Sequence, residues 1–389
     1  MSLSRREALG LLTAASASTL LHPGALLTRL AAEQPCIGSD VSGTLIGTLP
    51  LFRRDGQVQP FGVKVGGRGL DARLITDLSS LDPDHLVTSN QLVFVRTEAP
   101  RTRSGTIRLG GRGTGKSAES IADLAQRARS MGPHLLECAG NNNPANFGLL
   151  SVCEWDGVPL TDLVARLGPL PGAHGVLVSG VDPDSTSANS GGGASWVFPL
   201  AWLDRLGAFL AVRMNGEPLP PDHGAPIRLV VPGWYGCTWV KWVDEIRLTD
   251  ADEPATGQMK EFAGRTHQTA RHNLARDYSP ADIQTAAMPV RVEKRRTPTG
   301  IHYRIVGIVW GGKKPVEQLE IRFRSDDAWK PFSICPPPAT SRVWSLWEYV
   351  WKPMGPGIYD IALRVPDASV PQRRLDTGYY VRQVRVQEV

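Results

Sequence analysis

One cysteine, Cys138, stands where a short apolar stretch ends and a turn of small residues begins. The apolar residues 134–136 predict the end of a buried strand, and Ala139 and Gly140 follow the cysteine directly. A small residue and a glycine let the backbone approach closely whatever a thiolate at this position binds. Most free cysteines are simply small buried apolar residues, which is the alternative here. The surrounding residue types instead favour a metal ligand presented at a strand end.

The residues on both sides of Cys138 carry a family resemblance. Residues 137–141, Glu-Cys-Ala-Gly-Asn, are followed by Glu-Trp-Asp-Gly-Val-Pro-Leu at residues 154–160. This pair of motifs resembles the molybdenum-binding segment of the sulfite oxidase family. The resemblance implies that the Cys138 thiolate coordinates the molybdenum of a molybdopterin cofactor and that Asn141 belongs to the cofactor site.

A second stretch, residues 214–242, is similar to the same family in residue type and in spacing. The resemblance assigns His223, Arg228 and Lys241 to the pterin and its phosphate. A guanidinium fork, an ammonium group and an imidazole donor together suit an anionic phosphate. Taken singly, each could be a turn residue or an exposed strand charge. All three together with Cys138 favour the cofactor site.

Two further residues are assigned to the reacting centre by resemblance. Residues 92–95 predict a buried strand ending at Arg96, where the family has an Arg-Asn-His triplet. Only the arginine is kept, because Thr97 and Glu98 replace the other two. Tyr278 is similar to a family tyrosine whose hydroxyl points at the metal's ligand, and a tyrosine can donate a hydrogen bond or proton while uncharged at neutral pH.

The substrate pocket departs from the family pattern. Sulfite oxidases usually have two arginines after Cys-Ala-Gly-Asn, whereas this chain has Asn142 and Asn143, and Glu98 adds a carboxylate. Losing two charge-assisted hydrogen bonds of about 1.5–3 kcal/mol each weakens dianion binding by about two to four powers of ten. We therefore expect a poor sulfite oxidase that uses Arg96 to orient a neutral or less charged small molecule, such as an S-oxide. Plain sulfite dehydrogenase activity is the alternative.

Residues 110–117 satisfy the phosphate-loop pattern G-x-x-x-x-G-K-S, between a strand-like and a helix-like segment. An NTPase also needs a carboxylate at the end of a second apolar strand to hold Mg²⁺, and the next strand ends instead at Glu137 and Cys138. The family resemblance implies a glycine-containing hairpin that leads into a short helix. A P-loop NTPase and a cofactor-free binding protein are the competing function classes.

The length of 389 residues predicts two domains, and 40 Gly, 31 Pro and 11 Trp favour strands and turns over a helical bundle. Residues 33–285 are expected to form an α+β molybdopterin-binding domain with a mixed sheet, including a helix over about 200–212. The glycine-rich loop 182–195 fits either an active-site rim or a surface loop. Residues 286–389 alternate in short strands, which predicts an immunoglobulin-like β-sandwich. By resemblance this is a dimerisation domain, so a homodimer is expected.

The N-terminus is typical of an export signal. Arg5 and Arg6 open a weakly apolar stretch, and residues 1–32 are predicted to be a twin-arginine signal peptide, which exports folded, cofactor-loaded proteins to the periplasm. An amphipathic N-terminal helix is the alternative. No later segment has 18 uninterrupted apolar residues, so the mature protein is expected to be soluble.

Composition limits the partners. A formal net charge of +5 is mild, and the densest basic run, residues 291–296, contains Glu293 and suggests a solvated strand or linker, so no nucleic acid is expected. There is no haem-attachment or iron–sulfur motif, and a separate cytochrome or quinone-linked electron carrier is therefore expected. Besides Cys138, an oxidising compartment would permit disulfides among cysteines that the sequence cannot pair: Cys36, Cys153, Cys237 and Cys335.

Overall fold

The computed structural model describes residues 43–57, 74–81, 83–97, 99–100, 104–115, 117–141, 147–181, 194–373, 375 and 380–389. The predictions for residues 1–32, Cys36, Glu98, Asn142 and Asn143 lie outside these residues, as does most of the 182–195 loop.

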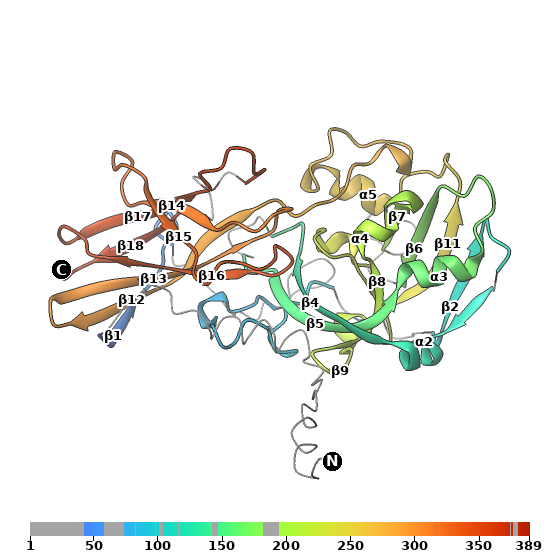
Figure 1. Cartoon of the computed structure of the whole chain (residues 1–389), viewed down its shortest axis with the longest axis horizontal. Coiled ribbons are helices and arrows are strands. Elements are labelled where there is room, and N and C mark those ends of the chain that lie inside the picture. The colour runs from blue at the N-terminus through green and yellow to red at the C-terminus, as the bar shows by residue number, and fades with distance from the viewer. Residues whose placement is uncertain are drawn as a thin grey trace, which may run out of the picture.

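Two five-stranded sheets form the first half of the chain (Figure 1). The first is antiparallel, in the order β10-β8-β5-β4 with β9 beside β8. Its strands are β4 Arg129–Glu137, β5 Leu150–Pro159, β8 Phe209–Met214, β9 Glu217–Pro218 and β10 Arg228–Val230. The second sheet has the order β3-β2-β11-β6-β7 and is mixed, because β2 and β11 run parallel. Its strands are β2 Thr106–Gly111, β3 Ala118–Ser120, β6 Gly175–Gly180, β7 Ser195–Pro199 and β11 Val243–Thr249.

The helices are short. The α-helices are α2 Ile121–Arg127, α3 Leu160–Leu167, α4 Leu203–Leu206 and α5 Gly257–Phe262. The 3-10 turns are η1 Leu78–Ser80, η3 Leu200–Trp202, η4 Pro221–His223, η5 Gly236–Thr238, η6 Ala263–Arg265 and η7 Ala275–Asp277. Among the described residues, no helix combines the length and apolar character needed to cross a bilayer.

The helix expected over about 200–212 is wrong. Only η3 and α4 form there, because Gly207 adopts a left-handed conformation at φ 60° and ends the helix. The apolar residues 208–212 that follow are buried in β8 and the residue before it. A continuous apolar run of this length suits a buried strand as well as a helix.

The phosphate-loop pattern at residues 110–117 is a hairpin. Strands β2 and β3 pair antiparallel, and α2 begins only after β3, as the family resemblance implied. The turn of this hairpin packs against the C-terminal end of α3, where the amide of Gly115 donates to the Leu167 carbonyl at 3.0 Å. A Cβ on Gly115 would lie 1.9 Å from the Arg166 carbonyl oxygen. Glycine is therefore needed here for close backbone packing, and the loop does not have the strand-to-helix form of a P-loop.

Two four-stranded antiparallel sheets, β1-β12-β13-β16 and β15-β14-β17-β18, are built from the C-terminal strands together with β1 near the N-terminus. Aromatic contacts join them: Phe323 stacks on Trp351 with ring centroids 4.3 Å apart, and Tyr359 meets Trp351 at 4.9 Å. The two sheets therefore pack face to face, as expected for a sandwich. The strands are β1 Thr44–Leu49, β12 Ala286–Thr297, β13 Gly300–Trp310, β14 Gln318–Arg322, β15 Lys330–Ser333, β16 Ser345–Trp351, β17 Gly357–Arg364 and β18 Arg382–Val386.

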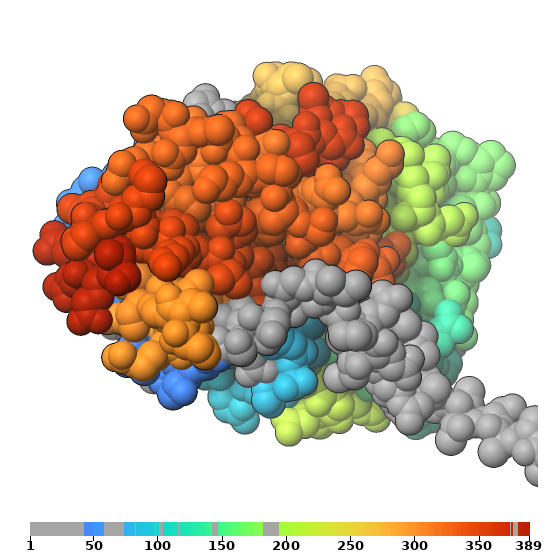
Figure 2. All heavy atoms as spheres, turned by 60° about the vertical axis from the view of Figure 1, so that its left-hand side comes forward, coloured from blue at the N-terminus to red at the C-terminus, as the bar shows by residue number. Residues whose placement is uncertain are grey.

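Strand β1 corrects the expected domain boundaries. It pairs with β12 from Thr44↔Arg296 to Leu49↔Val292, so this N-terminal segment belongs to the sandwich and not to a continuous 33–285 domain. Figure 2 shows its blue surface against the orange and red surface of the sandwich. This pairing joins residues about 250 positions apart, and nothing in the local sequence of β1 specifies its partner.

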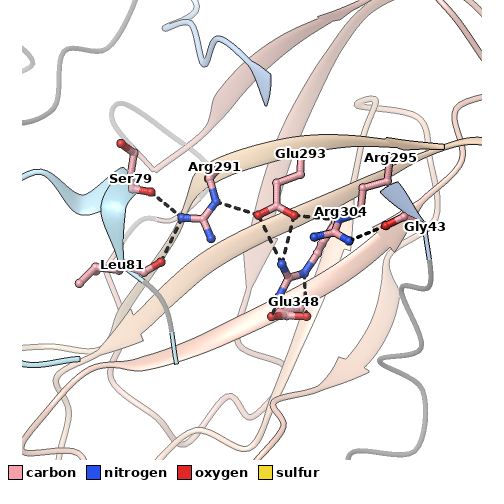
Figure 3. A network of polar contacts seen from close by, with 8 residues as sticks. All are labelled: Gly43, Ser79, Leu81, Arg291, Glu293, Arg295, Arg304 and Glu348. Atoms are coloured by element: carbon pink, nitrogen blue, oxygen red, sulfur yellow. Dashed lines mark hydrogen bonds and ion pairs between the residues drawn. The ribbon is translucent and has the colours of Figure 1, made fainter. Parts of the chain in front are cut away.

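The basic run 291–296 lies on β12, where its arginines surround one buried carboxylate (Figure 3). Glu293 accepts from Arg291 at 3.0 Å, from Arg295 at 2.9 Å and from Arg304 at 3.1 Å. Arg304 also pairs with Glu348. We refer to Arg291, Glu293, Arg295, Arg304 and Glu348 as the Glu293 network. Burial opposes ionisation of Glu293, but the hydrogen bonds from the three arginines outweigh it and lower the pKa of Glu293.

Candidate active site

The structure places Cys138 where the sequence predicted it, immediately after the last residue of β4. The strand pairs with β5 up to Glu137↔Leu150, and the Cys138 amide still donates to the Leu149 carbonyl at 3.0 Å. The chain then turns, and the Gly140 amide donates to the Cys138 Sγ at 3.3 Å. The thiol is half-buried, held by the sheet on one side and by the turn on the other.

Asn141 closes this turn. Its Oδ1 accepts from the amides of Gly148 and Leu149, each at 3.1 Å, and its Nδ2 donates to Glu137 Oε1 at 3.2 Å. Three of the four hydrogen-bonding positions of the amide are thus used within the chain. Asn141 therefore braces the turn and keeps one N–H for a ligand, and its assignment to the cofactor site stays a prediction.

Two guanidinium groups approach the thiol at Gly140. A Cβ added there would lie 3.5 Å from Cys138 Sγ, 3.6 Å from Nη1 of Arg265 and 3.9 Å from Nη2 of Arg96. Burial raises the pKa of the Cys138 thiol, while Arg96, the Gly140 amide and Arg265 oppose that rise. Both cations therefore favour the thiolate, which is the form that binds metals.

The chain before Arg96 is not the strand that was expected. Leu92 is 50% exposed, and the amides of Leu92 and Val93 both donate to the Ser89 carbonyl, which makes this a turn. Val95 makes a single bridge, to Leu74, while Val93 and Phe94 are buried. The buried side chains of Val93 and Phe94 therefore hold residues 92–95 in place, and these residues form no ladder of strand hydrogen bonds.

The residues assigned to the pterin phosphate also lie together. Arg228 bridges to Lys241, and its Nη1 donates to the His223 carbonyl at 3.0 Å. Gly224, at φ 111°, turns the chain over them, and a Cβ there would lie 2.9 Å from the Arg228 Cβ. Only glycine allows this close packing without strain.

The three side chains differ in how far they reach solvent. Arg228 is 3% exposed, lies over the rings of Trp155 and Trp239 at 5.3 and 5.8 Å, and has no partner for its Nε. Burial lowers the pKa of Arg228 to about 10. Burial, followed by the charges of Arg228 and Lys241, lowers the pKa of His223 to about 3, so this histidine is neutral near pH 7. Lys241 is half-buried and is the cation most able to reach a ligand.

Two adjacent residues join these groups. Arg96 approaches Gly140, and the carbonyl of the next residue, Thr97, accepts from Lys241 Nζ at 3.2 Å. Lys241 Nζ also donates to the Asp222 carbonyl at 2.9 Å. Residues 96 and 97 therefore link the predicted metal ligand to the predicted phosphate-binding cations.

Tyr278 has other partners. Its hydroxyl donates to the His272 carbonyl at 3.3 Å, and its ring meets the His272 ring at 5.4 Å. Among the described residues, none of its hydrogen bonds or ring contacts reaches Cys138 or Arg96, and its assignment to the reacting centre stays a prediction. The Asp-Tyr resemblance lay in a long irregular connection, where sequence spacing fixes position poorly.

An ion pair beneath the cysteine was not anticipated. Glu137 is fully buried, and its carboxylate accepts from Arg373 Nη1 at 2.7 Å, from Arg373 Nη2 at 2.6 Å and from Trp310 Nε1 at 2.9 Å. Arg373 and Trp310 both come from the sandwich half of the chain. The acidic residue next to the cysteine was the only sequence signal. The sandwich thus fixes the residue beside Cys138.

Tyr235 and His267 extend the contacts of the Glu137–Arg373 ion pair. The Arg373 guanidinium lies 5.5 Å from the centre of the Tyr235 ring, and the Tyr235 hydroxyl hydrogen-bonds His267 Nε2 at 3.3 Å. His267 has a left-handed backbone at φ 62°, which is uncommon for a residue other than glycine. Arg265, two residues before His267, is the residue whose guanidinium approaches Gly140.

The cysteines divide into two kinds. Cys335 is disulfide-bonded, whereas Cys138, Cys153 and Cys237 are free. Cys153 and Cys237 are buried, and burial raises the pKa of each. Of these three free thiols only Cys138 is half-exposed.

The site fits a molybdopterin cofactor in its donor set. The half-exposed thiol is a soft ligand suited to a transition metal. Lys241, with Arg228 and the neutral His223 around it, is suited to an anionic phosphate. The residues present therefore match both ends of the cofactor.

Comparisons with known proteins agree with this geometry. Residues 97–257 match the family model described as the oxidoreductase molybdopterin binding domain. The chain is 27% identical over 293 residues to sulfite oxidase of Gallus gallus, covering 68% of this chain and 63% of the relative. It is 26% identical over 291 residues to mitochondrial sulfite oxidase of Homo sapiens, covering 68% and 53%. The matches thus span between about half and three fifths of the length of these relatives.

A solved structure extends the comparison to the whole fold. The sulfane dehydrogenase SoxCD from Paracoccus pantotrophus aligns with a TM-score of 0.61 and 17% identity, covering 91% of this chain and 88% of that chain. At this identity the likeness concerns the fold alone. Together with the cysteine site, the matched domain and the relatives support a molybdopterin-binding oxidoreductase that is similar to the sulfite oxidases.

Proposed function

We propose that the chain catalyses two-electron oxo transfer between a small molecule and a molybdenum cofactor held by Cys138. The observation that carries the proposal is the half-exposed thiol at the end of β4, approached by Arg96 and Arg265. When bound, the cofactor supplies the oxo transfer and the one-electron steps that reset it.

The residues of the chain have separate tasks in this proposal. Cys138 holds the metal, while Lys241, supported by Arg228 and His223, binds the phosphate of the pterin. Arg96, which approaches Gly140, orients the substrate. Glu137 and Asn141 fix the turn, so the thiol stays in one position when the substrate arrives.

The decisive experiment replaces Cys138 with serine. We expect the variant to fold but to lose turnover, because a hard hydroxyl replaces the soft thiolate. Cys153→Ala is the matched control, since it removes a buried free thiol and should keep both metal and activity. Wild-type protein from a molybdenum-competent host should contain about one molybdenum per chain. Full activity in Cys138→Ser, or wild-type protein without molybdenum, would contradict the proposal and leave a cofactor-free binding protein.

The substrate is proposed to carry less charge than the sulfite dianion. Arg373 is neutralised by Glu137, which leaves fewer free cations at the site than the arginine count suggests. Steady-state kinetics with sulfite and an artificial acceptor test this point. A micromolar Michaelis constant with fast turnover would instead establish sulfite dehydrogenase activity.

Export through the twin-arginine route to the periplasm is proposed from Arg5 and Arg6. Changing both to lysine should leave cofactor-loaded protein in the cytoplasm. Undiminished periplasmic activity of the double variant would show that the pair is incidental.

Two partners are proposed as well. One is a separate cytochrome or quinone-linked electron carrier, and the other is a second copy of the chain, joined through the sandwich, which we propose to be of immunoglobulin type. Light scattering of the purified full chain should give the mass of a dimer. A monomer at all concentrations would contradict the second proposal.

A further inference from the structure

Arg382 is a buried arginine of the sandwich whose donors have no partner. It is the first residue of β18, where Arg382, Val384 and Val386 face the interior while Arg385 faces solvent. Arg382 is 0% exposed, yet its Nε and both terminal nitrogens have no hydrogen-bond partner among the described residues. Nearly all buried polar groups in proteins are hydrogen-bonded, and an orphaned one calls for an ion or an ordered water.

The backbone holds Arg382 in this inward position. It lies opposite Ile361 in the register of β17 and β18, and the next residue, Gln383, exchanges two backbone hydrogen bonds with Phe52, at 2.9 and 2.8 Å. A shift of one residue would turn the guanidinium outward, but it would also expose the valines of β18. The strand therefore keeps a charge at a position where the alternation calls for an apolar residue.

The guanidinium of Arg382 lies over the ring of Phe147, with Cζ 5.6 Å from the ring centre. Phe147 comes from the connection between β4 and β5, and its ring also meets the Tyr380 ring edge-on with centroids 6.1 Å apart. The site therefore lies where the sandwich meets the first half of the chain. A ring face attracts a guanidinium, but it does not use the N–H donors, which lie in the guanidinium plane.

The charges around Arg382 do not balance it. Burial, followed by the like charge of Arg53, lowers the pKa of Arg382 to about 10, so the guanidinium is still charged near pH 7. Arg53 is itself paired with Asp55. Tyr380 favours the charged form of Arg382, but a tyrosine hydroxyl is ordinarily neutral near pH 7. One buried positive charge thus has no counter-charge among the described residues.

We propose that Arg382 binds one small inorganic anion, such as chloride, at the junction between the sandwich and the first half of the chain. An anion of one charge accepts from the in-plane donors and neutralises the guanidinium, which removes the cost of burying an unpaired charge. A small ion suits a fully buried side chain, whereas a large organic anion would have to open the junction. The anion stabilises the fold, and the proposal does not depend on oxo transfer at Cys138.

The first test measures unfolding of the full-length protein in sodium chloride and in sodium gluconate of equal ionic strength. At a chloride concentration of about ten times the Kd, the equilibrium constant for unfolding should be about tenfold lower than in gluconate. Arg382→Met should fold, because an apolar side chain replaces a buried charge, and it should lose the chloride effect. Arg385→Gln, which changes an exposed arginine of the same strand, should keep the wild-type response.

An equal chloride effect in wild type and Arg382→Met, or no effect in wild type, would overturn the proposal. The second test needs no variant, so it decides the matter even if Arg382→Met fails to fold. Crystals of the wild-type protein are soaked in sodium bromide, and anomalous scattering should place a bromide within hydrogen-bond distance of the Arg382 guanidinium. Density there without anomalous scattering would identify a water and overturn the proposal. Bromide in the crystal without a chloride effect in solution would indicate an adventitious ion only.

Discussion

Arginines occur in two contrasting settings in this molecule. In the Glu293 network of the sandwich, Arg291, Arg295 and Arg304 all donate to one carboxylate, and Arg304 also pairs with Glu348 (Figure 3). At the cysteine, Arg96 and Arg265 approach Gly140 without forming an ion pair among the described residues.

The difference separates structural from binding roles. Arginines whose donors are used within the chain fix a strand or a turn and have little left for a ligand. Arg291 in addition donates to the carbonyls of Ser79 and Leu81, which attaches η1 to the sandwich. Arginines without such partners keep their charge available. The number of hydrogen-bond and ion-pair partners that each arginine has within the chain therefore identifies the binding site better than the number of arginines does.

The pair between Glu137 and Arg373 tests the structural side of this contrast most severely. The side chain of Arg373 is only 11% exposed and Glu137 is fully buried, so removing the partner leaves an uncompensated, largely desolvated charge. We expect Glu137→Ala to lower the free energy of unfolding by about 3–5 kcal/mol. Chemical denaturation of the full chain, followed by tryptophan fluorescence, measures this.

Glu348→Ala is the matched control, because the side chain of Glu348 is 23% exposed and Arg304 keeps Glu293 as a second partner. Its cost should be no more than about 1–2 kcal/mol. Equal costs for the two variants would show that burial of the ion pair at Glu137 has no special weight.

A pH effect extends the contrast to histidines. His134 is 5% exposed on β4, and burial, followed by the charge of Arg342, lowers the pKa of His134 to about 4. The unfolded chain has a histidine pKa of about 6.5, so below that pH the unfolded state binds the extra proton. Stability present above pH 6.5 is therefore lost as the pH falls toward 4. The loss between about pH 7.5 and about pH 5 should be about 2 kcal/mol.

The measurement compares denaturation of wild type and His134→Gln at both values of pH. The variant should lose about 2 kcal/mol less stability on acidification, since its side chain does not titrate. An identical loss in both proteins would assign the acid sensitivity to other groups.

The sequence predicted the structure best where the residues that determine it lie within one short segment. Cys138 after an apolar run predicted a thiol at a strand end, and the family resemblance of the neighbouring motifs implied the hairpin at 110–117. Repeated short strands likewise predicted the sandwich. In each case the residues that decide the structure are neighbours in the chain, so their order carries the information.

Contacts between distant segments could not be read in this way. Glu137 and Arg373 are 236 residues apart, and Arg265 approaches Gly140 although the two residues are distant in the sequence. Gly207, which ended the expected helix early, was visible in the sequence but was outweighed by the apolar residues that follow it. Long-range pairing depends on the whole fold, whereas motif reading uses local order.

Arg304→Gln tests the sandwich side of the contrast with a single uncharged replacement. The side chain is 18% exposed and donates to both Glu293 and Glu348. We expect a loss of about 1–2 kcal/mol in the free energy of unfolding, with no change in the kinetics of substrate turnover. A change in the Michaelis constant without loss of stability would reverse the roles assigned to the two groups of arginines.

Replacing Arg96, the arginine near Cys138, with glutamine should have the smallest effect on the free energy of unfolding. Arg96 has no ion pair among the described residues and lies near Arg265, another cation. Removing one of two like charges relieves repulsion, so Arg96→Gln should change the free energy of unfolding of the cofactor-free chain by less than about 0.5 kcal/mol. Denaturation of Arg96→Gln beside Arg304→Gln, under identical conditions, measures the difference. Turnover should show the opposite order, because Arg96 is proposed to orient the substrate and Arg304 has no contact with the site. If Arg96→Gln cost as much stability as Arg304→Gln, Arg96 would have a structural partner, and the unpaired arginines would no longer mark the binding site.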